Sequence, residues 1–237
     1  MQAVSHALFD LLSHPEYLQP LRVESEEIIR REGWTKSAVD KMCKIDSFIK
    51  ESQRLHPIGY CSSFILQFRD STDGHDSVTI GRIAINGYTF SNGQQIPAGT
   101  MLAAAATHNH LDSSTYENPL EFDGFRFLKM KESASLNAQS PNKRFDMTTT
   151  SPQFLAFSHG RHACPGRFFA AAEIKMILAY MIMTYDMKLI DGVRPPDVVL
   201  MNTVMANPSA KVLFRRRQSW LGIVTKTLRT EIVLLGF

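Results

Sequence analysis

One short stretch, residues 154–170, holds the side chains best suited to do chemistry. It reads FLAFSHGRHACPGRFFA, and its Cys164 directly precedes a run of apolar residues at helical spacing. Backbone N–H groups point outward at the start of a helix and the helix dipole is positive there, so a thiolate is stabilised and can ligate a metal. Gly160 and Gly166 permit a tight turn and close approach to a flat group. Phe157 could cover the sulfur and keep water out.

The order F-x-x-G-x-x-x-C-x-G in this stretch resembles the haem-binding loop of the cytochrome P-450 family. A lone cysteine before a helix is more often an ordinary buried thiol, but the register of the whole motif favours a ligand. The resemblance implies that Cys164 is the axial thiolate on the iron of haem b, which favours O–O cleavage. It implies that His162 contacts a haem propionate, and that Arg82 does so if the segment before it is discounted. The phenylalanine and both glycines of the motif would line the cofactor.

A second pattern, the E-x-x-R pair Glu51 and Arg54, ends a predicted helix. Residues three apart share a helix face and can form an ion pair, which most often lies in solvent and contributes little. In the family this pair is buried and joined by an arginine from a second segment. The matching segment here is FDGFRF, with Gly124 in place of the family's proline and Arg126 as the third member. We expect this triad to be structural, holding the loop near the haem.

The same region also allows a zinc site as an alternative. His159, His162 and Cys164 are residue types that ligate zinc, and His108 or His110 could add a further ligand. The three cysteines of the chain form no C-x-x-C pair, so no thiolate cluster supports this reading. A haem-thiolate protein reduced under carbon monoxide absorbs visible light characteristically, whereas a zinc site is colourless.

Composition limits the remaining possibilities. The 237 residues are 44% hydrophobic and 21% charged, as expected of a globular chain that can bury a core. A net charge of +3 is too small to indicate a nucleic-acid partner. An odd number of cysteines indicates no disulfide framework and fits a reducing compartment. No run approaches 18 consecutive apolar residues, so no membrane span is expected.

The predicted elements are mainly helical with small β-sheets, an α+β class corresponding to the C-terminal half of the cytochrome P-450 fold. On the third helix, Asp46 and Lys50 are expected to pair on the solvent side. The loop that leads into the cysteine stretch is expected at 133–151, because it is rich in Ser, Asn and Thr. Helices are predicted at 1–12, 16–32, 35–55 and behind Gly166, a β-hairpin around 91–93 within 82–100, and a terminal hairpin within 186–215.

The resemblance covers residues 1–218, as a partial haem-thiolate monooxygenase domain. Residues 65–81 interrupt the family pattern between two strands, so we interpret them as an insertion or an unspliced intron. The alternative is a longer surface loop, which folds tolerate at low entropic cost. Residues 219–237 follow no family pattern and form an unplaced tail.

The chain resembles only the second half of the family domain, and this restricts what can be assigned. It begins just past the acid–alcohol pair with which most members deliver protons to bound oxygen, so we assign no catalytic residue. Ser5 and His6 are the nearest polar residues, and a core or surface role is the better interpretation of both. The missing half would carry the oxygen-side helix and the membrane anchor. A truncated, catalytically inactive remnant is therefore an alternative to an active enzyme.

The resemblance implies a haem-dependent monooxygenase that inserts one atom of O2 into a small hydrophobic substrate. The residues of these motifs most resemble those of filamentous-fungal members that oxidise terpenoid-type secondary metabolites. Electrons would come from NADPH through an NADPH–cytochrome reductase, and the full-length protein would lie on the cytosolic face of the endoplasmic reticulum membrane. The basic residues Lys143, Arg144, Arg161 and Arg167 form either a solvated rim or a docking face for an acidic electron donor.

Overall fold

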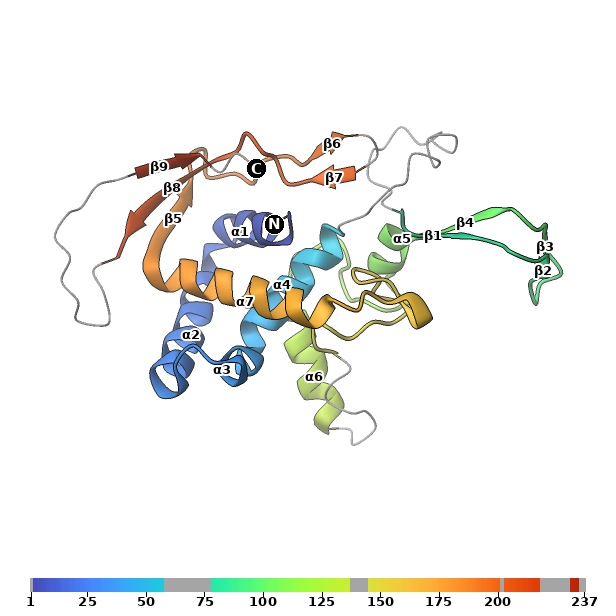
Figure 1. Ribbon diagram of the computed structural model, residues 1–237. Helices are drawn as coiled ribbons and strands as arrows, with labels where there is room; N and C mark the ends of the chain where they lie inside the picture. The colour runs from blue at the N-terminus through green and yellow to red at the C-terminus, as the bar shows by residue number, and fades with distance from the viewer. Residues whose placement is uncertain (1, 58–77, 137–144, 201–202, 218–230, 235–237) are drawn as a thin grey trace.

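The computed structural model describes residues 2–57, 78–136, 145–200, 203–217 and 231–234 of the chain. In these ranges helices form the body of the molecule, and short antiparallel strands lie at its borders (Figure 1). This confirms the predicted α+β class. No helix in the described ranges is both long and apolar enough to cross a bilayer.

The first four helices follow one another closely: α1 (Gln2–Ser13), α2 (Leu18–Glu32), α3 (Lys36–Lys41) and α4 (Cys43–Leu55). The prediction of one continuous helix over 35–55 is wrong, because the chain turns at Met42 (φ −73°, ψ 79°). The turn leaves the first N–H groups of α4 without helical partners. Glu24 on α2 accepts two of them, from Lys44 at 2.8 Å and from Ile45 at 3.1 Å, which stabilises the second start.

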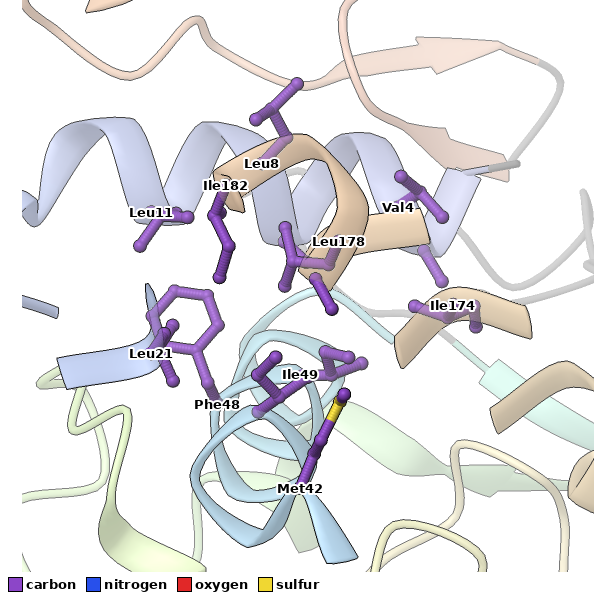
Figure 2. Close-up of a cluster of buried hydrophobic side chains, with 14 of the residues drawn as sticks. Val4, Leu8, Leu11, Leu21, Met42, Phe48, Ile49, Ile174, Leu178 and Ile182 are labelled. Atoms are coloured by element: carbon purple, nitrogen blue, oxygen red, sulfur yellow. The ribbon is translucent and has the colours of Figure 1, made fainter. Parts of the chain in front are cut away.

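The long helix α7 (Arg167–Thr184) packs against α1, α2, α3 and α4 and closes the core. Figure 2 shows the apolar side chains of these helices meeting in one cluster. Burial of each such side chain contributes about 1.5–3 kcal/mol before entropic costs. The cluster includes Val4, Leu8, Leu11, Leu21, Met42, Phe48, Ile49, Ile174, Leu178 and Ile182.

The expected surface pair on α4 does not form. Lys50 is 2% exposed, and its Nζ donates to the carbonyls of Phe145 and Asp146, each at 3.1 Å. The ammonium also lies over two aromatic rings at about 4.5 Å from their centroids. Burial lowers the pKa of Lys50 to about 8. Asp46 instead accepts from Lys175 on α7 at 3.1 Å, so both charges join α4 to other elements.

The described residues between α4 and the cysteine stretch form a β-hairpin and two helices. Strand β1 (Val78–Ile83) pairs with β4 (Met101–Ala105), and between them β2 (Tyr88–Thr89) pairs with β3 (Gln95–Ile96) around Gly93 (φ +86°). The predicted hairpin is confirmed, and Figure 1 shows it extending away from the helices. The helices are α5 (Ala106–His110) and α6 (Arg126–Leu136). The loop predicted at 133–151 therefore starts too early, since α6 continues to Leu136.

The C-terminal part is a set of antiparallel strands, which confirms the predicted terminal hairpin. A three-stranded sheet has the order β5-β8-β9, and a separate pair is β6-β7. In Figure 1 these strands lie along the side of the molecule that carries α1. Their bounds are β5 (Tyr185–Leu189), β6 (Val198–Leu200), β7 (Thr203–Met205), β8 (Lys211–Arg216) and β9 (Glu231–Leu234).

The suspected insertion and the C-terminal tail each contribute residues to a strand. Within the suspected insertion 65–81, residues 65–77 lie outside the described residues, and Val78 starts strand β1. Strand β1 therefore begins four residues before Arg82, inside the range interpreted as an insertion. Within the tail 219–237, Glu231–Leu234 forms β9 and pairs with β8, a strand that no pattern in the sequence indicates.

Candidate functional site

Cys164 lies in the short segment between the 3₁₀ turn Gly160–His162 and helix α7. Its thiol is partly buried and forms no disulfide. The Cys164 amide donates to the carbonyl of Phe157 at 2.9 Å, which closes the loop on itself. Arg167 Nη1 donates to the carbonyl of Cys164 at 2.7 Å, and its Nε donates to the carbonyl of Thr148 at 3.0 Å. The loop is therefore held at both ends, with the sulfur at the start of an 18-residue helix.

The space around the sulfur fits a haem thiolate. A Cβ built on Gly166 would lie 4.0 Å from Cys164 Sγ, and a Cβ built on Gly160 (φ +71°) would meet nothing within 4 Å. Both glycines thus keep side chains away from the loop surface. Phe168 and Phe169, in the first turn of α7, are 59% and 74% exposed. A free thiol is one of the donors that hold haem iron in proteins, so the residues of the loop fit this cofactor.

The other predicted cofactor residues lie in different surroundings. His162 is exposed at the end of the 3₁₀ turn, two residues before the cysteine. Arg82 is exposed on β1 opposite Leu102, and its Nη1 donates to the carbonyl of Gly81 at 2.7 Å. Phe157 is partly buried and packs against the main core.

The three members of the predicted triad meet in the interior. Arg54 makes a bidentate pair with Glu51, from Nε and Nη2 at 2.8 Å each, and both side chains are fully buried. Arg126 adds Nε contacts to the two Glu51 oxygens at 3.1 and 3.2 Å. One carboxylate therefore faces two guanidiniums, and the amide of Asp123 donates to it at 3.0 Å.

The remaining guanidinium hydrogens are taken up by backbone carbonyls of the loop 117–121 and its surroundings. Arg54 donates to the carbonyls of His110, Pro119 and Glu121, at 2.8, 2.7 and 3.3 Å. Arg126 donates to the carbonyls of Glu117, Asn118 and Glu121. A buried ion pair is tolerable only when its remaining donors are satisfied in this way. The triad thus fixes the loop onto α4.

His110 extends this network to the cysteine stretch. Its Nδ1 donates to the carbonyl of Arg54 at 3.0 Å, and its Nε2 accepts from the amide of Leu155 at 2.8 Å. Burial lowers the pKa of His110 to about 4, so the ring is neutral, as its one donor and one acceptor require. The ring links α4 to the segment that carries Phe157 and Cys164. It also has no ring nitrogen left for a metal.

The zinc alternative is not supported by the arrangement of its ligands. Among the described residues, which include His108, His159, His162 and Cys164, the group of three potential ligands that lies close enough to hold a metal is elsewhere, at His6, His56 and Asp197. His159 Nδ1 instead lies 3.3 Å from Thr150 Oγ1. Sequence spacing suggested a cluster here that the fold does not form.

A polar cluster that no sequence pattern indicates is formed by five side chains from three parts of the chain. His6 and Asp10 come from α1, His56 from the end of α4, and Arg194 and Asp197 from the segment before β6. His6, for which a core or surface role was expected, is 2% exposed and so lies in the core. The members are separated by up to 191 positions and form no motif, so spacing provides no signal for the group.

The basic residues proposed as a rim or docking face divide into two kinds. Arg161 is exposed on the 3₁₀ turn that precedes Cys164. Arg167 instead donates to the backbone carbonyls of Cys164 and Thr148, and its guanidinium carbon lies 4.4 Å from the centroid of the Phe168 ring. Lys143 and Arg144 lie outside the described residues.

Comparison with known proteins agrees with this geometry. A sequence model described as cytochrome P-450 matches residues 2–64 and 75–214, and so leaves out part of the suspected insertion. The chain is 43% identical to cytochrome P-450 monooxygenase 151 of Postia placenta over 216 residues, which are 91% of this chain and 39% of that protein. It is 35% identical over 218 residues to cytochrome P-450 monooxygenase CYP512U6 of Ganoderma lucidum, covering 92% of this chain and 38% of the relative.

A third similar protein is the ent-kaurene oxidase of Fusarium fujikuroi, 35% identical over 219 residues, which are 90% of this chain and 37% of that protein. The chain thus spans about 39% of the length of the curated fungal relatives that it matches. The family is one of haem-thiolate oxidoreductases that use haem b and electrons derived from NADPH. The matched family model, the relatives and the cysteine loop agree: this chain belongs to the cytochrome P-450 family.

Proposed function

We propose that this chain is the cysteine-bearing part of a haem-thiolate monooxygenase that inserts one atom of O2 into a small hydrophobic substrate. The observation that carries the proposal is the position of Cys164, a free and partly buried thiol held at the start of α7 with open space on its glycine-lined side. Haem b, when bound, supplies the activation of oxygen. Cys164 would be its axial ligand.

The neighbouring residues of this chain would bind and orient the cofactor. His162 is exposed two residues before the ligand, and its ring can donate to an anionic propionate. Arg82 would serve a second propionate, for which its exposed guanidinium is suited. Gly160 and Gly166 would let the porphyrin approach the backbone, and Phe157 would exclude water from the sulfur side. The Glu51–Arg54–Arg126 triad would be structural.

The substrate proposed is a terpenoid-type secondary metabolite. Support comes from a relative named ent-kaurene oxidase, whose name designates oxidation of a hydrocarbon. The electron source proposed is an NADPH–cytochrome reductase, with exposed Arg161 contributing positive charge to its docking face. For the whole protein we propose the cytosolic face of the endoplasmic reticulum membrane as its location.

A catalytically inactive remnant is the second candidate, and the exposure of apolar side chains that follow the cysteine in sequence, such as Phe168, favours it. On this view the 237-residue chain alone binds haem weakly, because apolar surface near the thiol, including Phe169, is uncovered. We also propose that residues 65–74, which the family match leaves out, are an insertion. The tail beyond residue 218 would be an addition to the family domain.

Haem titration distinguishes an active part from a remnant. The chain is titrated alone and as a chimera, in which the preceding segment of the Postia placenta relative is fused to residues 1–218. We expect stoichiometric binding and substrate-dependent NADPH consumption only in the chimera. A stable, stoichiometric complex of the chain alone would contradict weak binding. A chimera that binds haem but turns over no terpenoid hydrocarbon would contradict the substrate.

A further inference from the structure

The cluster of His6, Asp10, His56, Arg194 and Asp197 joins α1, α4 and the terminal strands, and neither haem binding nor the triad uses it. The two imidazole rings are stacked, with centroids 5.0 Å apart and planes 1° from parallel. Arg194 Nε donates to Asp10 Oδ1 at 2.6 Å, and its Nη1 donates to Asp197 Oδ1 at 2.9 Å. The guanidinium thus bridges a carboxylate on α1 and one in its own segment.

Hydrogen-bond chemistry fixes the charge of His6. Its Nδ1 lies 3.0 Å from Arg194 Nη2. A guanidinium has donors only and stays protonated in proteins, so Nδ1 must present a lone pair to it. A ring whose Nδ1 accepts is neutral, with its hydrogen on Nε2. His6 is therefore held in the uncharged form by its arginine partner.

The same reasoning gives His56 the opposite charge. Its Nδ1 lies 3.0 Å from Asp197 Oδ2, and its Nε2 lies 3.3 Å from Asp10 Oδ1. Ionised carboxylates only accept, so both ring nitrogens must carry hydrogen, which makes the ring an imidazolium. Asp10 also accepts from Ser52 Oγ at 2.5 Å, so its second oxygen is satisfied as well.

The formal charges of the cluster cancel when these assignments are combined. Two carboxylates, Asp10 and Asp197, face two cations, Arg194 and His56, and His6 is neutral. The potential ligand atoms of His6, His56 and Asp197 lie within 4.8 Å of one another, a spacing that suits a divalent cation. However, Arg194 already donates to His6 and to Asp197, so the protein's own guanidinium takes the place of a metal.

We propose that this cluster is a pH-sensitive latch that clamps the 194–197 segment, and with it the terminal strands, onto α1 and α4, because its stacked histidines are held in opposite charge states. Raising the pH discharges His56 and leaves two carboxylates facing one arginine. Lowering the pH charges His6 against that arginine. The latch is tightest between these limits and loosens on either side.

The pKa shifts agree in direction with the geometry. Burial alone would lower the pKa of His56, but its hydrogen bonds to Asp10 and Asp197 outweigh burial and raise it. The stability from His56 is therefore complete below about pH 6.5, the unfolded value, and is lost as pH rises through the raised folded value. Burial lowers the pKa of His6 to about 4, although the charge of Asp197 opposes this. Its contribution is present above about pH 6.5 and is lost as pH falls toward 4.

The loss of stability on either side of the optimum pH does not come from the carboxylates. Burial alone would raise the pKa of Asp197, yet its bond from His56 and the charge of Arg194 lower it to about 2. The pKa of Asp10 is lowered too, because bonds from His56 and Ser52 and the charge of Arg194 outweigh its burial. Both stay ionised across the range in which the histidines change. Opening the latch leaves the terminal strands attached to α1 through contacts such as that from the Ala206 amide to Gln2 Oε1 at 2.9 Å.

The charge states can be read directly by nitrogen-15 NMR of the histidine rings in the full 237-residue chain between pH 5 and 8.5. At pH 7 we expect both nitrogens of His56 to be protonated and His6 to be neutral with its hydrogen on Nε2. Signals are assigned with His6→Gln and His56→Gln, or by through-bond correlation if a variant fails to fold. A neutral His56 at pH 7, or two rings that titrate together near about 6.5, would overturn the proposal.

Unfolding of the same chain as a function of pH supplies the second readout. In the wild type the unfolding constant should rise with pH above about 6.5, by up to tenfold per pH unit until the folded value is passed. His56→Gln should flatten this alkaline limb. His6→Gln, whose amide oxygen can still accept from Arg194, should make the acid limb shallower, and the slope that remains belongs to His110, whose pKa burial also lowers to about 4. The matched control is His108→Gln at an exposed ring, which should leave both limbs unchanged. An alkaline limb that persists in His56→Gln, or an acid limb that is as steep in His6→Gln as in the wild type, would contradict the latch.

Discussion

Helix α4 carries two buried ionic clusters on different faces, and they are built on opposite principles. Glu51 and Arg54 point toward Arg126, where two guanidiniums hold one carboxylate and the surplus hydrogens go to backbone carbonyls. Ser52 and His56 point toward Asp10 and its partners, where two carboxylates are held by one arginine and one histidine. The first cluster consists of one carboxylate and two guanidiniums, whereas the second contains histidine, the side chain whose ordinary pKa lies between pH 5 and 8.

The difference shows that the strength of a buried ionic cluster can be constant with pH or can vary with it. The triad fixes a loop and, through His110, the segment that leads to Cys164, and none of its three members is a histidine. The histidine cluster fixes the terminal strands, which lie far along the chain from α1, and its strength should vary with pH. Substitutions that remove one partner from each cluster test this contrast.

The largest effect is expected from Glu51→Gln. The amide leaves two buried guanidiniums without a counter-charge, and breaking a buried pair in this way costs about 3–5 kcal/mol of unfolding free energy. The loss should be the same at every pH between 5 and 8. Denaturant unfolding measures it, and Asp40→Asn in the exposed Lys36–Asp40 pair is the control, with an expected loss of about 1 kcal/mol or less. A pH-dependent loss at Glu51 would remove the contrast.

The next largest effect is expected from Arg194→Ala. Two carboxylates and a neutral ring then lose their shared donor, at a cost of about 2–3 kcal/mol of unfolding free energy. The vacated space is bordered by His6, His56 and Asp197, so the variant should bind Zn²⁺ more tightly than the wild-type chain does. Calorimetric titration with zinc chloride measures the gain. Equal zinc binding by both chains would show that the arginine does not occupy a cation site.

A smaller effect is expected from Gly124→Ala beside the triad. An added Cβ would lie 2.6 Å from Phe48 Cδ2 and 3.0 Å from the Tyr17 ring, so the substitution overpacks the core at a cost of about 1–3 kcal/mol. Gly81→Ala is the matched control, because nothing lies within 4 Å of its Cβ and its φ is ordinary. Thermal unfolding compares the two variants. An unchanged melting temperature for Gly124→Ala would mean that the loop yields easily.

Sequence reasoning reached the triad but not the histidine cluster, and the reason is physical. A motif records residues whose spacing along one helix places them together, as Glu51 and Arg54 are placed, and a recognised second segment adds Arg126. The partners of His56 lie as far apart in the sequence as His6 and Asp197. Only the packing of α1 against the terminal strands brings them together. Long-range packing of that kind leaves no local pattern.

The same limit explains the errors in the elements. Local propensity favoured one helix over 35–55, but Glu24 on another helix caps a second start after Met42. An i,i+4 rule placed Lys50 in solvent, whereas carbonyls and rings from distant segments surround it. The strand β9 exists because β8 offers it an edge. The hairpin and the helix after Gly166, which depend on local periodicity, were predicted correctly, and so was the fold class that the family resemblance implies.

The most direct test of the central claim, that Cys164 ligates haem iron, is the spectrum of the haem-loaded protein reduced under carbon monoxide. Cys164→Ser is compared with Cys43→Ser, a partly buried thiol on α4 that serves as the matched control. We predict that the control keeps the red-shifted band of thiolate ligation and that Cys164→Ser loses it. A band that is unchanged in Cys164→Ser would contradict the assignment.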